Sequence, residues 1–294
     1  MTHTPVLLKE AMELLSPRPG EFFVDGTVGG GGHARGILER LGEKGTLLAL
    51  DWDKETAAVF AAESKRYKTK VITEHANYAD LPRVLEKHGL GKADGLLLDL
   101  GFSSWQVDES GRGFSFRKDE PLYMTYDEEQ ESVASILSRL TEQELAKIIR
   151  ELGGERYAGR IAKAIKDRTK KEAITSSLEL AEVVKAAVPA GYERGRIDPA
   201  TRTFQALRIY ANEELENLKE ILDELPEAAA AGGRVVIISF HSLEDGMVKR
   251  HFRKMAAEGR GKILTARPVR PTDEEKENNP RSRSAKLRAF IFNN

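Results

Sequence analysis

The fold is decided by a stretch near the N-terminus, which reads Phe22-Phe23-Val24-Asp25-Gly26-Thr27-Val28-Gly29-Gly30-Gly31-Gly32-His33. A short apolar run ends in an acid, a loop with five glycines follows, and residues 34–41 continue as a helix-like run. This order of strand, tight glycine turn and helix is typical of the first unit of a nucleotide-binding α/β fold. Glycine is needed because such a turn uses positive φ angles and lies close to a ligand, where a Cβ would collide.

Two related glycine motifs do not fit this stretch. A P-loop needs Lys and then Ser or Thr after its last glycine, whereas Gly32 is followed by His33. The dinucleotide fingerprint spaces its glycines, whereas four of these are contiguous. An acid at the strand end, Asp25, suits a ligand that carries an amine better than a pyrophosphate. The alternative interpretation is a flexible surface loop without a ligand.

The composition limits the classes of protein that the chain can form. Its 294 residues allow one large or two ordinary domains, and 40% hydrophobic residues suffice for a core. The absence of cysteine excludes disulfides, zinc–thiolate sites and cysteine nucleophiles. The six histidines do not pair at ligand spacing, so we expect no metal. With no signal-peptide pattern and no apolar run near ~18 residues, we expect a cytoplasmic protein without a membrane span. A monomer and a homodimer both remain open.

Hydrophobic periodicity predicts an α/β domain interrupted by a helical one. The expected parallel strands are 22–25, 46–51, 70–74, 95–101 and 234–240. The expected helices of this domain are 5–15, 33–41, 54–65, 80–88 and a long helix over 202–225 that ends at Pro226. Segments 262–265 and 286–292 could pair as terminal strands, with a mobile loop over 271–280 between them. Helical patterns fill 131–188, with one helix expected over 156–168. The sequence therefore predicts an α/β domain over 1–105 and 204–294, with an inserted all-helical domain over 106–203.

Acids end three of the predicted strands. Asp25, Asp51 and Asp99 stand at carboxyl ends, and ligands of open α/β sheets bind in the crevice outside those ends. An acid after the second strand, Asp51, is placed to accept hydrogen bonds from ribose hydroxyls. Because three neighbouring acids repel one another, the site should favour a cationic or hydroxyl-rich ligand.

Several longer segments resemble the bacterial MraW/RsmH family. They are Asp25–His33, Leu98–Gln106 with Arg112–Phe116, Ala200–Ile209 and Ile238–Asp245, together with His3–Val6 and Asn279–Ser284. The resemblance implies an S-adenosylmethionine-dependent enzyme that methylates N4 of a cytidine in the decoding region of 16S ribosomal RNA. It also implies a class I, Rossmann-like methyltransferase domain with an inserted helical domain that recognises the RNA. The expected partner is therefore 16S rRNA or the small ribosomal subunit.

The same resemblance implies a set of cofactor contacts. Cofactor contacts are expected at Gly31, Gly32, His33, Asp51 (ribose), Tyr78 (adenine), Asp99 and Gln106. The physical interpretation adds Asp25 as a partner for the ammonium group of the cofactor.

Catalysis should depend on how the acceptor amine is held. The cytosine amino group is conjugated with its ring, so a hydrogen-bond acceptor near it would orient it and favour charge developing on nitrogen. Asp99, or a carbonyl of the 100–104 loop, is the first candidate, with Ser103 and Ser104 next. Asp99 could instead only orient the cofactor. His241 follows the 234–240 strand and could hold the flipped base or a phosphate, or simply fix its loop.

RNA contact needs cationic surface, and three groups of residues offer it. They are Arg156, Arg160, Lys163 and Lys170 near one helix face; Arg281, Arg283, Lys286 and Arg288 in the tail; and Arg112 beside Phe114 and Phe116, where a splayed base could stack. Residues 249–294 hold 13 Lys and Arg against 5 Asp and Glu. A solvated helix face, an ordinary tail and a structural turn are the alternatives.

The sequence departs from the family after Phe116. The usual pattern Gly-Pro-Leu-Asp-Met-Arg-Met-Asp is replaced by a segment in which Tyr123 and Thr125 take the places of the acid and the arginine, and Gly246 replaces a basic residue. This leaves two alternatives to the expected enzyme: a methyltransferase with a shifted nucleic-acid substrate, and a catalytically impaired rRNA-binding or assembly protein of the same fold. A Rossmann dehydrogenase is a third.

Overall fold

The computed structural model describes residues 4–101, 110–127, 129–195 and 197–294. Its chain divides into two compact units, with limits at residues 102/103 and 214/215. The sheet unit contains both ends of the chain, and the insert unit contains the segment between them. Among the described residues, no helix is long and apolar enough to cross a membrane.

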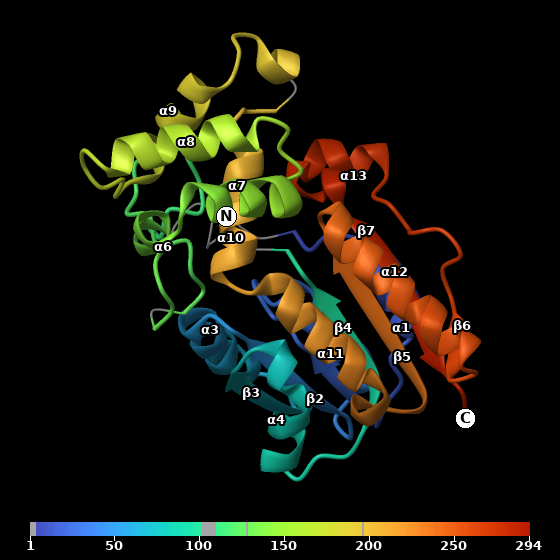
Figure 1. Cartoon of the computed structure of the whole chain (residues 1–294). Coiled ribbons are helices and arrows are strands. Elements are labelled where there is room, and N and C mark those ends of the chain that lie inside the picture. The colour runs from blue at the N-terminus through green and yellow to red at the C-terminus, as the bar shows by residue number, and fades with distance from the viewer. Residues whose placement is uncertain (1–3, 102–109, 128, 196) are drawn as a thin grey trace. The chain divides into compact units, whose positions relative to one another are not determined.

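The sheet unit is built around seven strands (Figure 1). The strands are β1 Phe22–Asp25, β2 Thr46–Asp51, β3 Lys70–His75, β4 Ala93–Asp99, β5 Ala229–Ser239, β6 Gly261–Ile263 and β7 Lys286–Phe292. The helices are α1 Leu8–Leu15, α2 Gly32–Leu41, α3 Lys54–Ser64, α4 Leu81–Lys87, α11 Glu214–Ala228, α12 Ser242–Ala257 and α13 Asp273–Asn278, with short 3₁₀ turns η1 Tyr78–Asp80 and η3 Pro280–Ser284.

The strand order places a crevice at the end of β1. The order is β3-β2-β1-β4-β5-β7-β6. Strands β1 to β5 are parallel, whereas β7 runs antiparallel to both of its neighbours. The chain winds outward from β1 to β3 and then crosses back to β4, so the winding reverses between β1 and β4, where such sheets bind ligands. The predicted Rossmann-like sheet and the pairing of the two terminal strands are confirmed.

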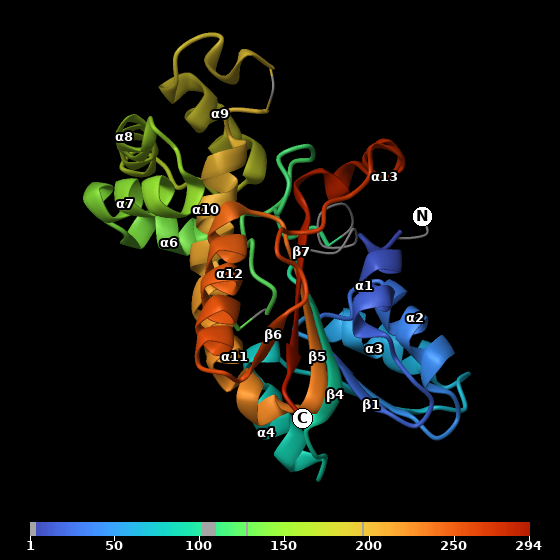
Figure 2. The same cartoon turned by 90° about the vertical axis from the view of Figure 1, so that its right-hand side faces the viewer.

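Helices cover both faces of the sheet (Figure 2). One face packs against α1, α2 and α3, and the other against α4, α11 and α12. Successive strand residues alternate between these layers: Phe23 faces the first and Val24 the second. Burial on both faces explains why the central strands read as continuous apolar runs.

The insert unit is helical and has its own core. Its elements are α6 Val133–Arg139, α7 Glu142–Gly153, α8 Ala158–Thr169, α9 Ser177–Ala187, η2 Tyr192–Gly195 and α10 Thr201–Ala211. Fully buried Leu145, Ile161 and Leu207 belong to one cluster contributed by α7, α8 and α10. Within the described residues of this unit the one β feature is an isolated bridge, so the predicted all-helical insertion is confirmed. The helix predicted over 156–168 begins only at Ala158.

The long helix predicted over 202–225 is wrong. The chain instead forms α10 and α11, separated by Asn212 and Glu213, and Glu213 has a left-handed φ of 49°. The buried Asn212 amide donates hydrogen bonds to the carbonyls of Met124 (2.8 Å) and Arg208 (2.9 Å). Tertiary hydrogen bonds thus end the helix where periodicity alone would continue it, and the insert unit extends to residue 214 rather than to 203.

The mobile loop predicted over 271–280 is also wrong. It contains α13, whose first turn is capped by the Thr272 hydroxyl, which accepts the Glu275 N–H at 3.1 Å. The Glu275 carboxylate in turn accepts the N–H of Leu7 at 2.8 Å, which fastens α13 to the start of the chain. The Thr-x-x-Glu spacing is a helix-start signal that the surrounding polar composition obscured.

Close packing at the centre of the sheet gives a stability test. A Cβ added to Gly95 of β4 would overlap the ring of Phe23 in the neighbouring strand. We expect Gly95→Ala to destabilise the protein by about 2 kcal/mol or more, because a close-packed core has no room for the methyl group. Gly91→Ala, where a Cβ meets nothing within 4 Å, is the matched control. Chemical denaturation measures both, and equal stabilities of the two variants would contradict the packing.

Candidate active site at the carboxyl ends of the strands

Three acids lie at one edge of the sheet unit. Asp25 is the last residue of β1, Asp51 of β2 and Asp99 of β4. Because β1 pairs in parallel with both β2 and β4, these strand ends are adjacent. Asp25 and Asp51 are buried, and the Asp99 side chain is 16% exposed. The predicted gathering of acids at one sheet edge is confirmed.

The glycine loop is hydrogen-bonded to all three strand ends. The Thr27 N–H donates to Asp25 Oδ1 at 3.1 Å, and the Gly29 N–H donates to Asp51 Oδ2 at 2.7 Å. The Thr27 hydroxyl oxygen accepts the N–H of Asp99 at 2.6 Å. Thr27 therefore connects β1 to β4, a role that the glycine pattern did not indicate.

The glycines of this loop are required by the protein's own packing. Gly31 has a φ of 73°, and a Cβ there would lie 2.9 Å from the Phe60 ring. A Cβ on Gly32 would lie 2.7 Å from Pro5. These contacts hold the backbone against α3 and the N-terminal segment, which leaves the predicted cofactor contacts of Gly31 and Gly32 as predictions.

His33 is an internal residue that contacts the third acid. Its Nε2 lies 2.9 Å from the carbonyl oxygen of Val6, and because a carbonyl only accepts, Nε2 bears the proton. Its Nδ1 lies 3.6 Å from Asp99 Oδ2. His33 is neither a surface residue nor a helix cap, since the N-cap of α2 is Gly31.

Two carboxylate oxygens retain hydrogen-bonding capacity. Asp25 Oδ2 and Asp99 Oδ1 are buried and accept no hydrogen bond from any described residue. Buried oxygens of this kind are normally satisfied. A ligand with N–H donors and positive charge would satisfy both, which is the chemistry of an ammonium- and sulfonium-bearing nucleoside.

Burial shifts the titration of the three acids. Together with the nearby charge of Asp25, it raises the pKa of Asp99 to about 8. Burial also raises the pKa of Asp25 to about 7 and that of Asp51 to about 6, although backbone N–H groups oppose both shifts. A positively charged ligand would reverse these shifts, because an opposite charge favours the ionised acid.

Comparison with known proteins decides the family. The model of the MraW methylase family matches residues 1–292. The chain belongs to the MraW methylase family. It is 45% identical over 305 residues to the ribosomal RNA small subunit methyltransferase H of Syntrophobacter fumaroxidans, covering 98% of this chain and 96% of that protein. The protein of the same name from Syntrophus aciditrophicus is 46% identical over 307 residues, covering 97% and 96% respectively.

The family membership confirms the predicted chemistry. MraW methylases use S-adenosylmethionine, so methyltransferase activity and the predicted cofactor are confirmed, and the dehydrogenase alternative is wrong. The orphaned oxygen of Asp25 fits the ammonium group of this cofactor. Tyr78, the predicted adenine contact, lies half-buried at the start of η1, directly after β3. Ser103, Ser104 and Gln106 lie outside the described residues.

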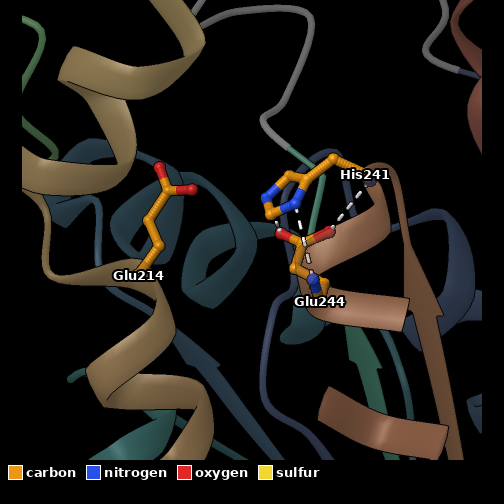
Figure 3. Close-up of side chains that lie close together, drawn as sticks. All are labelled: Glu214, His241 and Glu244. Atoms are coloured by element: carbon orange, nitrogen blue, oxygen red, sulfur yellow. Dashed lines mark hydrogen bonds and ion pairs between the residues drawn. The ribbon is translucent and has the colours of Figure 1, made fainter. Parts of the chain in front are cut away.

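His241 of this MraW methylase caps a helix. Its Nδ1 accepts the Glu244 N–H at 3.4 Å, and the Glu244 carboxylate accepts the N–H groups of Phe240 (2.8 Å) and His241 (3.3 Å). Figure 3 shows the imidazole of His241 against that carboxylate. This reciprocal capping box fixes the turn from β5 into α12. It corresponds to the loop-fixing alternative, and we do not propose a chemical role for His241.

The aromatic candidates of the MraW insert face its own core. Phe114 stacks on Tyr126 with ring centroids 5.3 Å apart, and Phe116 meets the edge of Phe204 at 5.0 Å. Arg112 donates to the carbonyl of Tyr126 at 2.8 Å. These contacts correspond to the structural-turn alternative, so we do not propose Arg112, Phe114 or Phe116 as a base-stacking surface.

The basic candidates divide into paired and unpaired groups. Lys170 lies 3.8 Å from Asp167, and Lys286 and Arg288 both pair with Asp245. Arg283 is exposed, and Arg281 lies beside it in η3. No carboxylate in the described ranges lies within ion-pair distance of three exposed residues of the insert unit: Arg156, Arg160 and Lys163.

The raised carboxyl pKa values predict how stability depends on pH. In the cofactor-free protein the folded state binds these protons more tightly than the unfolded state, whose carboxyl pKa is near 4. Stability is therefore greatest near pH 4 and falls as the pH rises, and the contribution of each acid levels off above its folded pKa of about 6 to 8.

We expect the melting temperature of the wild type to fall between about pH 5 and pH 8, and that of Asp99→Asn to fall less, because an amide does not ionise. S-adenosylmethionine should reduce the fall in the wild type, because its positive charge stabilises the ionised acids. Scanning calorimetry with and without the cofactor measures this. Parallel pH curves for wild type and Asp99→Asn would contradict the assignment.

Proposed function

We propose that this chain transfers the methyl group of S-adenosylmethionine to N4 of a cytidine in the decoding region of 16S rRNA. The observation that carries the proposal is Asp99: a buried carboxylate at the sheet's ligand-binding edge, with one oxygen unpartnered among the described residues. The names of the relatives support small-subunit rRNA as the substrate.

The acceptor sets the chemical requirement. S-adenosylmethionine supplies a methyl carbon activated by the adjacent sulfonium. The cytosine amine is a weak nucleophile because its lone pair is conjugated with the ring. Asp99 Oδ1 accepts a hydrogen bond from this amine, which orients the lone pair and stabilises positive charge developing on nitrogen.

Proton transfer completes the reaction. The new bond joins the amine nitrogen to the methyl carbon, the carbon–sulfur bond breaks with its electron pair on sulfur, and one amine proton passes to Asp99. The positive charge of bound S-adenosylmethionine would favour the ionised form of Asp99, so the carboxylate could accept this proton. Methyl transfer removes the sulfonium charge, and burial, which raises the pKa of Asp99 to about 8, then favours retention of the proton at neutral pH. His33 Nδ1 lies 3.6 Å from Asp99 Oδ2 and faces the same carboxyl group.

The insert unit offers a surface for single-stranded RNA. The guanidinium of Arg156 lies over the rings of Tyr157 (5.1 Å) and Tyr192 (4.8 Å), and that of Arg160 lies 5.7 Å from the Tyr157 ring. The buried Glu155 holds both tyrosines: it accepts the Tyr192 hydroxyl at 2.9 Å and the Tyr157 N–H at 2.7 Å. A planar guanidinium group held on aromatic rings can stack on a splayed base, and its positive charge attracts the neighbouring phosphate.

Two of the three positions that depart from the family pattern, Tyr123 and Thr125, differ in environment. Tyr123 is 52% exposed, whereas Thr125 is 3% exposed. Thr125 therefore belongs to the folded insert, and Tyr123 leaves an aromatic ring at its surface. The catalytically impaired protein and the shifted substrate are the outcomes that the following experiment separates.

Mass spectrometry of rRNA nucleosides tests the proposed function. Incubation of unmethylated small subunits with the protein and S-adenosylmethionine should produce N4-methylcytidine, which nuclease mapping should locate in the decoding region. Asp99→Asn should reduce the rate about 100-fold or more, in line with the loss of an acid–base group. Naked rRNA and DNA serve as alternative substrates. Product on DNA alone would show a shifted substrate, and no product on any substrate would favour the binding protein.

Charge removal from the insert tests its role in RNA binding. Arg156→Gln/Arg160→Gln should raise KM for the rRNA substrate about tenfold and leave cofactor affinity unchanged, because both cations are exposed and neither lies within ion-pair distance of a carboxylate among the described residues. Lys170→Gln is the matched control, since its ammonium already pairs with Asp167. Steady-state kinetics and calorimetry supply the two readouts. An unchanged KM in the double variant would contradict this role.

A further inference from the structure

A small cavity lies in the sheet unit, lined by residues other than the three acids at the strand ends. It measures ≈ 300 Å³ and lies between α12, the segment after β6, and β7. Its lining consists of Lys249, Phe252, Arg253, Ile263, Thr265, Ala266 and Arg288. Three of these residues are basic, and within the described structure none is acidic. Figure 1 shows α12 and β7 side by side, as the packing of Phe252 on Phe290 requires.

The basic groups of this cavity are only partly neutralised. Arg288 is 7% exposed and donates its Nε–H to Asp245 Oδ1 at 2.7 Å. Lys286 also pairs with Asp245, at 3.3 Å, so one carboxylate serves two cations. Lys249 and Arg253, one turn apart on α12, have no carboxylate within ion-pair distance in the described part of the chain. The cavity therefore carries an excess of positive charge.

A hydroxyl adds a neutral donor to these cations. Thr265 is buried, and its Oγ1 accepts the N–H of Ala289 at 3.0 Å. That bond uses a lone pair of the oxygen, so the O–H remains available to donate. Guanidinium, ammonium and hydroxyl donors around a small cavity match the oxygens of a phosphate group.

The other lining residues favour a backbone phosphate over a free nucleotide. Phe252, the aromatic residue of the lining, is 1% exposed and packs against Phe290, so its ring offers no surface on which a base could stack. The segment beyond β6 carries two further exposed arginines, Arg267 and Arg270, which would extend a cationic path along a polyanion.

We infer that this cavity is a phosphate site that binds the backbone of an RNA, and the identity of that RNA as rRNA rests on the proposed function. The site receives one phosphodiester group: Lys249 and Arg253 contact its charged oxygens, and Arg288, fixed by Asp245, closes the inner side. Lys249 and Arg253 were not among the basic residues that the sequence singled out.

RNA binding by charge variants tests the site. The probe is a fluorescein-labelled, single-stranded RNA of twelve nucleotides without cytidine, titrated by fluorescence anisotropy at several salt concentrations. Lys249→Gln/Arg253→Gln should weaken binding about tenfold and flatten the salt dependence by about 0.7 for the lost phosphate contact. Lys254→Gln on the same helix is the matched control, because its ammonium already lies 4.0 Å from Glu258. It should match the wild type in affinity and slope.

Wild-type affinity in the double variant, or equal weakening in Lys254→Gln, would overturn the site. The melting temperature of each variant checks that it folds. The single variant Arg253→Lys should keep the salt slope of the wild type, because lysine carries the same charge.

In a second arm, inorganic phosphate is titrated at constant ionic strength. Tight, Arg253-dependent binding of phosphate alone that RNA does not displace would assign the cavity to a small anion instead. Because the probe lacks cytidine, loss of methyl transfer and loss of RNA binding are separate results.

Discussion

The rest of the sheet unit depends on the burial of three carboxylates at adjacent strand ends. Loss of hydration is the main reason why the pKa of each lies well above its ordinary value, and a nearby acid adds to the shift: Asp51 for Asp25, Asp53 for Asp51, and Asp25 for Asp99. The glycine loop offsets part of this cost, because its N–H groups and the Thr27 hydroxyl bond to all three strand ends. The part of this cost that is not offset favours the binding of a positively charged ligand, and a cationic cofactor meets this requirement. The folded protein therefore already has a site that favours a cation before the ligand binds.

The sequence predicted this site because its signals are local. A strand that ends in an acid can be recognised from a few residues, and the parallel sheet then brings Asp25, Asp51 and Asp99 together without further information. The role of His33 was not predictable in this way. Its partners are Val6, which comes from the N-terminal segment, and Asp99, which comes from another strand. Only the packed structure shows that Gly31 and Gly32 are required by contacts with Phe60 and Pro5.

Charge counting along the sequence failed for a related reason. It drew attention to Lys286 and Arg288, yet both share one carboxylate, that of Asp245 forty-odd residues earlier in the chain, which neutralises them in part. Lys249 and Arg253, which lie within the basic segment 249–294, were not singled out, because they lie on an ordinary-looking helix. Whether a charge is neutralised depends on which residues pair in the tertiary structure. A tail that looks basic can therefore be partly neutral, while a helix that looks solvated can line a cationic cavity.

The break after α10 was not predicted for the same reason, because the side chain of Asn212 ends that helix through long-range hydrogen bonds.

The conspicuous segment from Ile238 to Asp245 serves to position Asp99. The Glu244 carboxylate accepts the N–H of Phe240, which fixes the Phe240 ring at the end of β5. That ring lies so close to Gly101 that a Cβ there would approach it to 2.7 Å. The Gly101 N–H in turn bonds to the Asp99 carboxylate and lowers its pKa against the larger effect of burial. The cap between β5 and α12 therefore fixes the Gly101 backbone, which holds Asp99 at the end of the neighbouring strand β4. The same segment also acts through charge, because the nearby Glu244 carboxylate helps to raise the pKa of Asp99.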